Sequence, residues 1–95
     1  MELLLTADER QAAASELPQW SFSDNALERA VSASTFQAAI DWVIQIAAVA
    51  EEMDHHPDID IRWRTLRLVA TTHSAGGLTA RDVALAKRID EIVGR

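Results

Sequence analysis

The chain lacks cysteine altogether and has little positive charge. The absence of cysteine excludes a disulfide framework, a thiol nucleophile and a thiolate metal site. Nine basic residues stand against 15 acidic residues, and the formal net charge is −6. Nucleic-acid binding needs a basic face that contacts phosphates, so nucleic acid is not an expected partner.

Long apolar runs are also absent. The longest, residues 44–50, contains Gln45 and is far shorter than the roughly 20 residues that span a bilayer, so no membrane partner is expected. The first five residues carry no basic charge and are soon followed by Asp8 and Glu9, unlike a signal peptide. The cytoplasm is therefore the expected location. Hydrophobic residues make up 48% of the chain, which is enough for one core, and we expect a single domain over residues 1–95.

The first third of the sequence predicts a helix followed by a hairpin. Thr6 and Glu9 fit a capping box at the start of a short helix, which should end before Pro18. Residues 20–32 place strand-like segments on either side of Asp24-Asn25, a pair typical of a two-residue turn. These residues therefore predict a β-hairpin.

A longer helix is expected next. Ser34-Thr35-Phe36-Gln37 starts it, with Gln37 fitting a second capping box, and Met53 lies near its end because Pro57 follows. Five residues at helical spacing predict one buried stripe: Phe36, Ile40, Val43, Ala47 and Ala50. Further apolar residues lie outside the stripe, which predicts a helix covered on two sides.

The last third predicts two strands and a helix. Residues 58–64 alternate between polar and apolar, and the alternation changes parity before residues 65–68, so a bulge or tight turn is expected near residues 63–65. Gly76-Gly77 breaks the chain, and Thr79 caps a final helix. The order α-β-β-α-β-β-α predicts an α+β two-layer sandwich, with helices on one face of a four-stranded antiparallel sheet.

All three histidines lie within a short stretch, in Asp54-His55-His56-Pro57 and in Thr72-His73-Ser74. Imidazole has an unperturbed pKa of roughly 6.5 and can move protons near neutral pH. We expect His73 to end the fourth strand beside Gly76-Gly77. Asp82 and Glu51 could orient an imidazole, although Asp82 is also suited to stabilise the dipole of the last helix.

Other interpretations of these residues remain open. His55 or His56 could simply end the second helix, and His73 could be an exposed loop residue. The three histidines with Asp54 or Asp82 could also form a metal site, although the spacing matches no known metal motif. Trp20 is most simply a core residue, but it could form an aromatic platform for a flat ligand.

The motifs together resemble those of the pterin-4α-carbinolamine dehydratases. The resemblance covers about residues 17–93. The segments that carry it are Leu17-Pro18-Gln19-Trp20, Phe36 with the helix through Ala50-Glu51, Asp54-His55-His56-Pro57, Thr71-Thr72-His73, Gly77-Leu78-Thr79, Asp82 and Leu85-Ala86.

That resemblance implies dehydration of 4a-hydroxytetrahydropterin to quinonoid dihydropterin, without a metal or cofactor. It implies that His55, His56 and His73 line the pterin pocket and carry the catalysis. The residues expected to bind the substrate or hold the imidazoles are Glu51, Asp54, Thr72, Ser74, Asp82 and Trp20. His55 and His73 would exchange protons with the leaving hydroxyl, and His56 would orient the ring.

The sequence departs from the animal members of this family after His56-Pro57. Ile59, Ile61 and Trp63 replace their Trp, Asn and Tyr, and the resulting pattern resembles a bacterial branch. The resemblance also implies a homodimer or homotetramer. A non-catalytic binding or dimerisation module on the same fold is the alternative from a different functional class.

Overall fold

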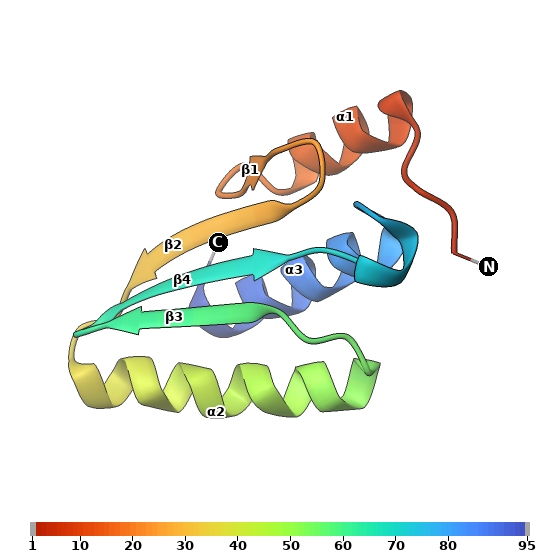
Figure 1. The fold of residues 1–95 in the computed structure, drawn as a ribbon. Coiled ribbons are helices and arrows are strands. Elements are labelled where there is room, and N and C mark those ends of the chain that lie inside the picture. The colour runs from red at the N-terminus through yellow and green to blue at the C-terminus, as the bar shows by residue number, and fades with distance from the viewer. Residues whose placement is uncertain (1, 95) are drawn as a thin grey trace.

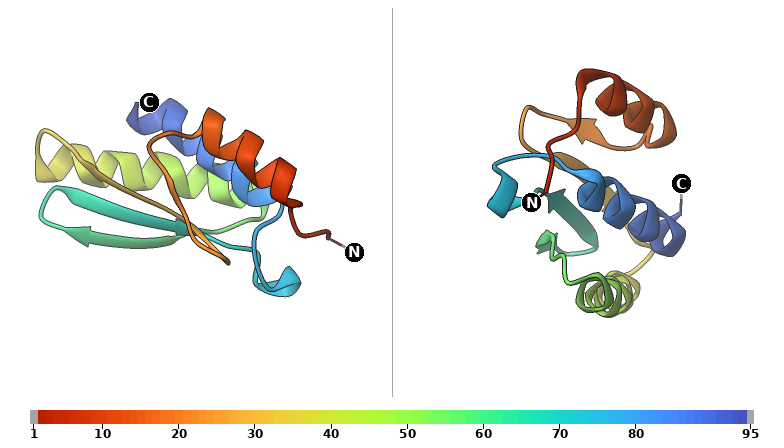
Figure 2. Two further views of the ribbon diagram at one scale, coloured as in Figure 1. Left: turned by 90° about the horizontal axis from the view of Figure 1, so that it is seen from above. Right: turned by 90° about the vertical axis from the view of Figure 1, so that its right-hand side faces the viewer.

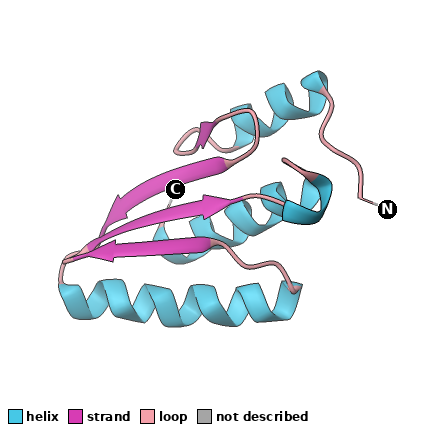
Figure 3. Ribbon diagram, viewed as in Figure 1, coloured by secondary structure: helices cyan, strands magenta, loops and turns pink. Residues whose placement is uncertain are grey.

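The chain alternates helices and strands in the predicted order, and the computed structural model describes residues 2–94 (Figures 1 and 3). The elements are α1 (Ala7–Glu16), β1 (Ser21–Phe22), β2 (Leu27–Ser32), α2 (Phe36–Met53), β3 (Asp58–Arg62), β4 (Thr65–Ala70), the one-turn 3₁₀ helix η1 (His73–Ala75) and α3 (Ala80–Val93).

The four strands form one antiparallel sheet in the order β1-β2-β4-β3. Phe22 pairs with Leu27, which confirms the predicted hairpin. Arg62 pairs with Thr65, so a two-residue turn at residues 63–64 produces the predicted change of parity. The three α-helices cover one face of this sheet (Figure 2), as expected for the predicted sandwich.

Local polar caps fix where the outer helices begin. Thr6 forms a capping box with Glu9 at the start of α1, and Thr79 forms another with Asp82 at the start of α3. The predicted capping box at the start of α2 is wrong. Thr35 is the N-cap there, since its side chain accepts from the amide of Ala38 at 3.0 Å.

The face of α2 that is buried also differs from the predicted stripe. Its fully buried residues are Ala39, Ile46 and Ala50, whereas Phe36 is 51% exposed and Ala47 is exposed. The contacts of α2 with α3 and the sheet set this rotation, and the helix has apolar residues on too many sides for its sequence to specify which side faces inward.

Mostly aliphatic side chains from the helices, the central strands and the segments that join them form the core. Its members are Leu17, Trp20, Leu27, Ala33, Ala39, Ile46, Leu66, Leu68, Ala70, Leu78, Leu85, Ala86 and Ile89. With this core in place, the end of α2, the segment after β4 and the start of α3 lie at one end of the molecule (Figure 1).

Candidate active site

The two histidine segments meet in one open hollow of about 260 Å³ at this end of the sandwich. His55 and His56 reach it from the turn after α2, and His73 reaches it from η1. The prediction that His73 ends the fourth strand is wrong, because β4 ends at Ala70. The lining residues are Asp54, His55, His56, Thr71, Thr72, His73, Ser74 and Arg81.

A left-handed residue directs the two adjacent histidines into their different environments. Asp54 caps α2 with φ of 50°, and the amide of His55 donates back to the carbonyl of Ala50 at 3.0 Å. His55 is then 8% exposed, while the side chain of His56 is 55% exposed. The two adjacent rings therefore lie in different environments and bind different carboxylates.

His55 is held by a fully buried carboxylate. Its Nε2 lies 2.6 Å from Oδ1 of Asp82, which has no solvent exposure. A carboxylate only accepts hydrogen bonds, so we assign the ring proton to Nε2. The other nitrogen, Nδ1, is then the one available to a molecule in the hollow.

Asp82 is itself fixed on its second oxygen. Oδ2 accepts from the amide of Thr79 at 2.9 Å and from the hydroxyl of Thr72 at 2.8 Å. The Thr72 hydroxyl in turn accepts from that of Thr79 at 2.8 Å. Asp82 is fully buried and held on both oxygens, so it gives His55 a fixed hydrogen-bond partner.

The remaining histidines are more exposed. His56 pairs through Nε2 with Oε2 of Glu51, a residue of the last turn of α2. Glu51 thus contacts His56 and not His55. His73 is exposed, and its ring makes no hydrogen bond to any residue in the range 2–94. It is therefore available as a proton donor or acceptor.

Trp20 is not part of this hollow. It is 6% exposed in the core, and its Nε1 donates to Oδ1 of Asp90 at 2.8 Å. The interpretation of Trp20 as a platform for a ligand is therefore wrong. Asp90 lies two turns along α3 from Asp82, and it also accepts from Arg29 in a buried ion pair.

Arg81 lines the hollow and was not among the predicted site residues. Its guanidinium donates to the carbonyl of Asp54 and, at 2.5 Å, to Oε1 of Glu2. The sequence did carry one signal for it. Arg81 lies in the first turn of α3, where the helix dipole disfavours a cation, so its position needs another explanation.

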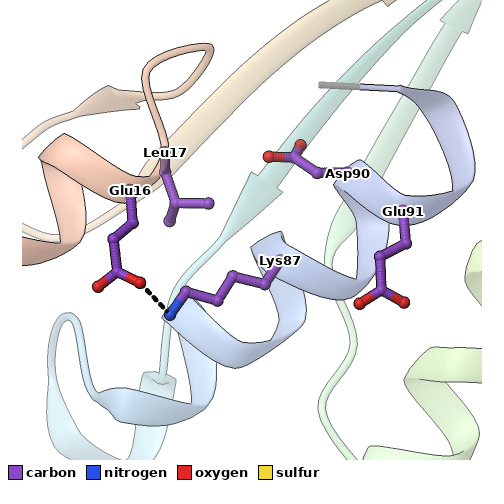
Figure 4. A pocket seen from close by; sticks show the side chains of 5 residues that line it. All are labelled: Glu16, Leu17, Lys87, Asp90 and Glu91. Carbon is purple, nitrogen blue, oxygen red and sulfur yellow. Dashed lines mark hydrogen bonds and ion pairs between the residues drawn. The ribbon is translucent and has the colours of Figure 1, made fainter.

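A smaller hollow at the other end of α3 has different chemistry. It measures about 190 Å³ and is lined by Glu16, Leu17, Lys87, Asp90 and Glu91 (Figure 4). Glu16 and Lys87 are joined by a 2.7 Å ion pair across it. None of the predicted site residues line this hollow.

Within residues 2–94, no three histidine, aspartate or glutamate side chains lie close enough together to hold a metal ion, so the metal alternative lacks a ligand set. No helix of this part of the chain is long and apolar enough to cross a membrane.

A family model and similar proteins from other organisms all point to the same family. The family model described as pterin 4 alpha carbinolamine dehydratase matches residues 3–92. A protein of Mycobacteroides abscessus is 52% identical over 97% of this chain and 98% of its own length. One of Nocardia farcinica is 49% identical over 94% of each. Both names are provisional assignments as pterin-4-alpha-carbinolamine dehydratase.

Solved structures show the same fold. The crystal structure of a transcriptional coactivator/pterin dehydratase from Brucella melitensis has a TM-score of 0.92 and 30% identity, covering 97% of this chain and 100% of that one. A pterin dehydratase-like protein identified as a RuBisCO assembly factor has a TM-score of 0.67 at 18% identity, over 79% of this chain and 87% of that one. The latter similarity concerns the fold alone.

Proposed function

This chain belongs to the pterin 4 alpha carbinolamine dehydratase family, a family of hydro-lyases, and we propose that it dehydrates 4a-hydroxytetrahydropterin to quinonoid dihydropterin. The observation that carries the proposal is the arrangement of imidazoles around one hollow. His55 is oriented by the buried Asp82, and His73 lies exposed on the same hollow.

The proposed reaction needs two proton movements. The C4a–O bond breaks, and the hydroxyl leaves as water after it gains a proton. A ring N–H of the pterin loses a proton to complete the quinonoid product. No electron acceptor is required, and positioned acid–base groups typically accelerate such steps by about 10²–10⁴-fold.

His55 and His73 are the proposed proton carriers. The Asp82 carboxylate holds the Nε2 proton of His55, which leaves Nδ1 as the basic nitrogen and also stabilises the ring when Nδ1 is protonated. His73 can exchange its proton freely because its ring is exposed. His56, held by Glu51, is proposed to orient the pterin ring.

Polar groups beside the histidines are proposed to contact the pterin. Asp54 and Ser74 are exposed and line the hollow, so their side chains can reach a ligand there. Thr72 and Asp82 are buried, and their proposed role is limited to orienting His55. No metal or cofactor takes part in this scheme.

We further propose that the chain works as a homodimer or homotetramer. Phe36, Ile44 and Trp63 are 51%, 63% and 71% exposed, and β3 is an edge strand of the sheet. Large exposed apolar residues and an unpaired strand edge are typical of an interface between subunits.

The test of the reaction is a kinetic comparison with the spontaneous process. Freshly generated 4a-hydroxytetrahydropterin is mixed with the purified protein, and quinonoid product is followed with and without a chelator. We expect dehydration that is much faster than the spontaneous reaction and unchanged by the chelator. A rate equal to the spontaneous one would reject the proposal.

A non-catalytic binding module is the second candidate. The exposed apolar residues favour it, and the similar protein from Brucella melitensis is named as a transcriptional coactivator as well as a pterin dehydratase. The discriminating result is genetic. If a strain that carries His73→Ala in place of the wild-type chain keeps the biological role intact, the binding module is supported over the enzyme.

A further inference from the structure

The N-terminal segment lies against the rim of the candidate active site. The amide of Leu5 donates to the carbonyl of Leu78 at 2.9 Å, which fixes this segment just before α3. The side chain of Leu4 lies so close to Gly77 that a Cβ there would meet Leu4 Cδ2 at 3.2 Å. These contacts bring the carboxylate of Glu2 to Arg81 and Ser74, two residues that line the hollow.

Glu2 and Arg81 together connect the two histidine segments. One guanidinium nitrogen of Arg81 donates to the carbonyl of Asp54, the residue directly before His55. The other donates to Oε1 of Glu2 at 2.5 Å. Oε2 of Glu2 accepts from the hydroxyl of Ser74, directly after His73, at 3.1 Å. The chain of contacts thus runs from one side of the hollow to the other.

The turn before His55 has a structural need for such a contact. Asp54 adopts a left-handed conformation with φ of 50°, which costs a non-glycine residue free energy and needs support from its surroundings. The backbone amide of Asp54 bonds within the end of α2, and its carbonyl is bound by Arg81. The η1 segment on the other side of the hollow is a single turn whose Ser74 is exposed, so it also depends on outside contacts for its position.

We propose that Arg81 and Glu2 are positioning residues that set the separation of the two histidine segments across the hollow. This proposal rests on the proposed dehydratase function for its effect on rate. Neither residue needs to touch the pterin or move a proton. Their effect is to keep His55 and His73 in place while the substrate reacts.

The charges of the pair persist at neutral pH. The hydrogen bond from Arg81 holds the pKa of Glu2 below its ordinary value of 4.5, and the hydrogen bond from Ser74 acts in the same direction. Glu2 is therefore an anion throughout the neutral pH range. The bridge that Glu2 and Arg81 form between Asp54 and Ser74 is therefore present at the neutral pH at which the proposed reaction is expected to run.

Arg81→Gln is the primary test, and Arg88→Gln is its matched control. Arg88 also lies on α3 and pairs with Glu52 of α2 at 2.8 Å, but it does not line the hollow. We expect Arg81→Gln to lower kcat by between about tenfold and 10²-fold, with a much smaller change in KM, because misplaced groups lose rate. Arg88→Gln should leave both constants unchanged.

A double-mutant comparison tests the bridge itself. Glu2→Gln should lower kcat less than Arg81→Gln does, and it should have no further effect in the Arg81→Gln background. Arg81→Lys, which keeps the charge but not the planar pair of donors, should recover only part of the rate. Independent, additive effects of the two substitutions, or a raised KM with unchanged kcat in Arg81→Gln, would overturn the proposal.

Amide hydrogen exchange tests the positioning role without any catalysis. The amide of His55 bonds to Ala50, and that of Gly76 bonds to the carbonyls of Thr72 and His73. Both amides should exchange faster in Arg81→Gln than in Arg88→Gln. Equal exchange in these two variants would refute the bridge, whereas a wild type inactive on pterin that shows the expected exchange would refute only the dehydratase function.

Discussion

At the scale of single residues, the central feature is the pairing of His55 with Asp82. Sequence alone places Asp82 at the third position of a helix, where a carboxylate caps and stabilises the helix. The structure shows the same carboxylate serving two purposes, since one oxygen completes the capping box and the other holds the imidazole. Stability and orientation of the ring are therefore coupled in one residue.

Replacement of Asp82 by Asn should lower both the rate of the reaction and the stability of the fold. The amide cannot accept from every donor around it, and it cannot stabilise a protonated His55 as a carboxylate does. We expect kcat/KM to fall by about 10²-fold or more. The free energy of unfolding should fall by about 1–3 kcal/mol. Enzyme assays and urea unfolding measure the two effects.

Asp90→Asn provides the control for this substitution. Asp90 is a second buried carboxylate on α3 that bonds Trp20 and Arg29, away from the candidate site. It should cost stability while the folded protein keeps its kcat/KM. If both variants lose activity equally, the loss follows general destabilisation, and the role given to Asp82 is wrong.

Single residues also show what could not be predicted from the sequence. His55 and Asp82 are 27 positions apart, so their contact depends on how α2 and α3 pack. The histidine segments were predictable because their residue types carry a chemistry that the pattern reveals. Trp20 was assigned wrongly because an indole that donates to a buried carboxylate cannot be distinguished in sequence from one that faces a ligand.

At the scale of elements, most local signals were reliable where a contact spans only a few residues, although the capping box predicted for α2 was wrong. The capping box of α1, the cap that Thr79 forms on α3 and the turn between β3 and β4 depend on neighbours in sequence, and all three were predicted. The rotation of α2 depends on the rest of the fold. Its apolar residues surround too much of the helix, so the predicted stripe missed Ala39 and Ile46.

The start of α2 gives a direct test at this scale. Because Thr35 is the N-cap and its hydroxyl accepts from the amide of Ala38, Thr35→Ala should lower the free energy of unfolding by about 1 kcal/mol. Ser34→Ala should change it by less than about 0.5 kcal/mol, as for an ordinary surface residue. Urea unfolding of the two variants compares them, and the opposite order would support the cap predicted from sequence.

At the scale of the whole molecule, charge distribution affects stability toward acid. Arg67 on β4 binds both carboxylate oxygens of Glu28 on β2 at 2.8 Å, and this hydrogen bonding holds the pKa of Glu28 below its ordinary value of 4.5. Because the pKa of Glu28 is lower in the folded state than in the unfolded chain, the pair stabilises the fold at pH values above the unfolded-state pKa. That contribution is lost as the pH falls through the folded pKa.

Glu28→Gln should therefore be less stable than the wild type at pH 7, and the difference should shrink at about pH 3. Urea unfolding at both pH values measures it. A difference that is the same at the two values would show that the pair contributes through packing and not through charge.

The most direct test of imidazole catalysis is the rate of dehydration by His73→Ala relative to the wild type. His73 is exposed, so its removal should change the free energy of unfolding by less than about 0.5 kcal/mol. If imidazole acid–base chemistry drives the reaction, turnover should fall by about 10²-fold or more in a protein that remains folded. A wild-type rate in the His73→Ala variant, or losses of rate and stability in equal proportion, would contradict this account.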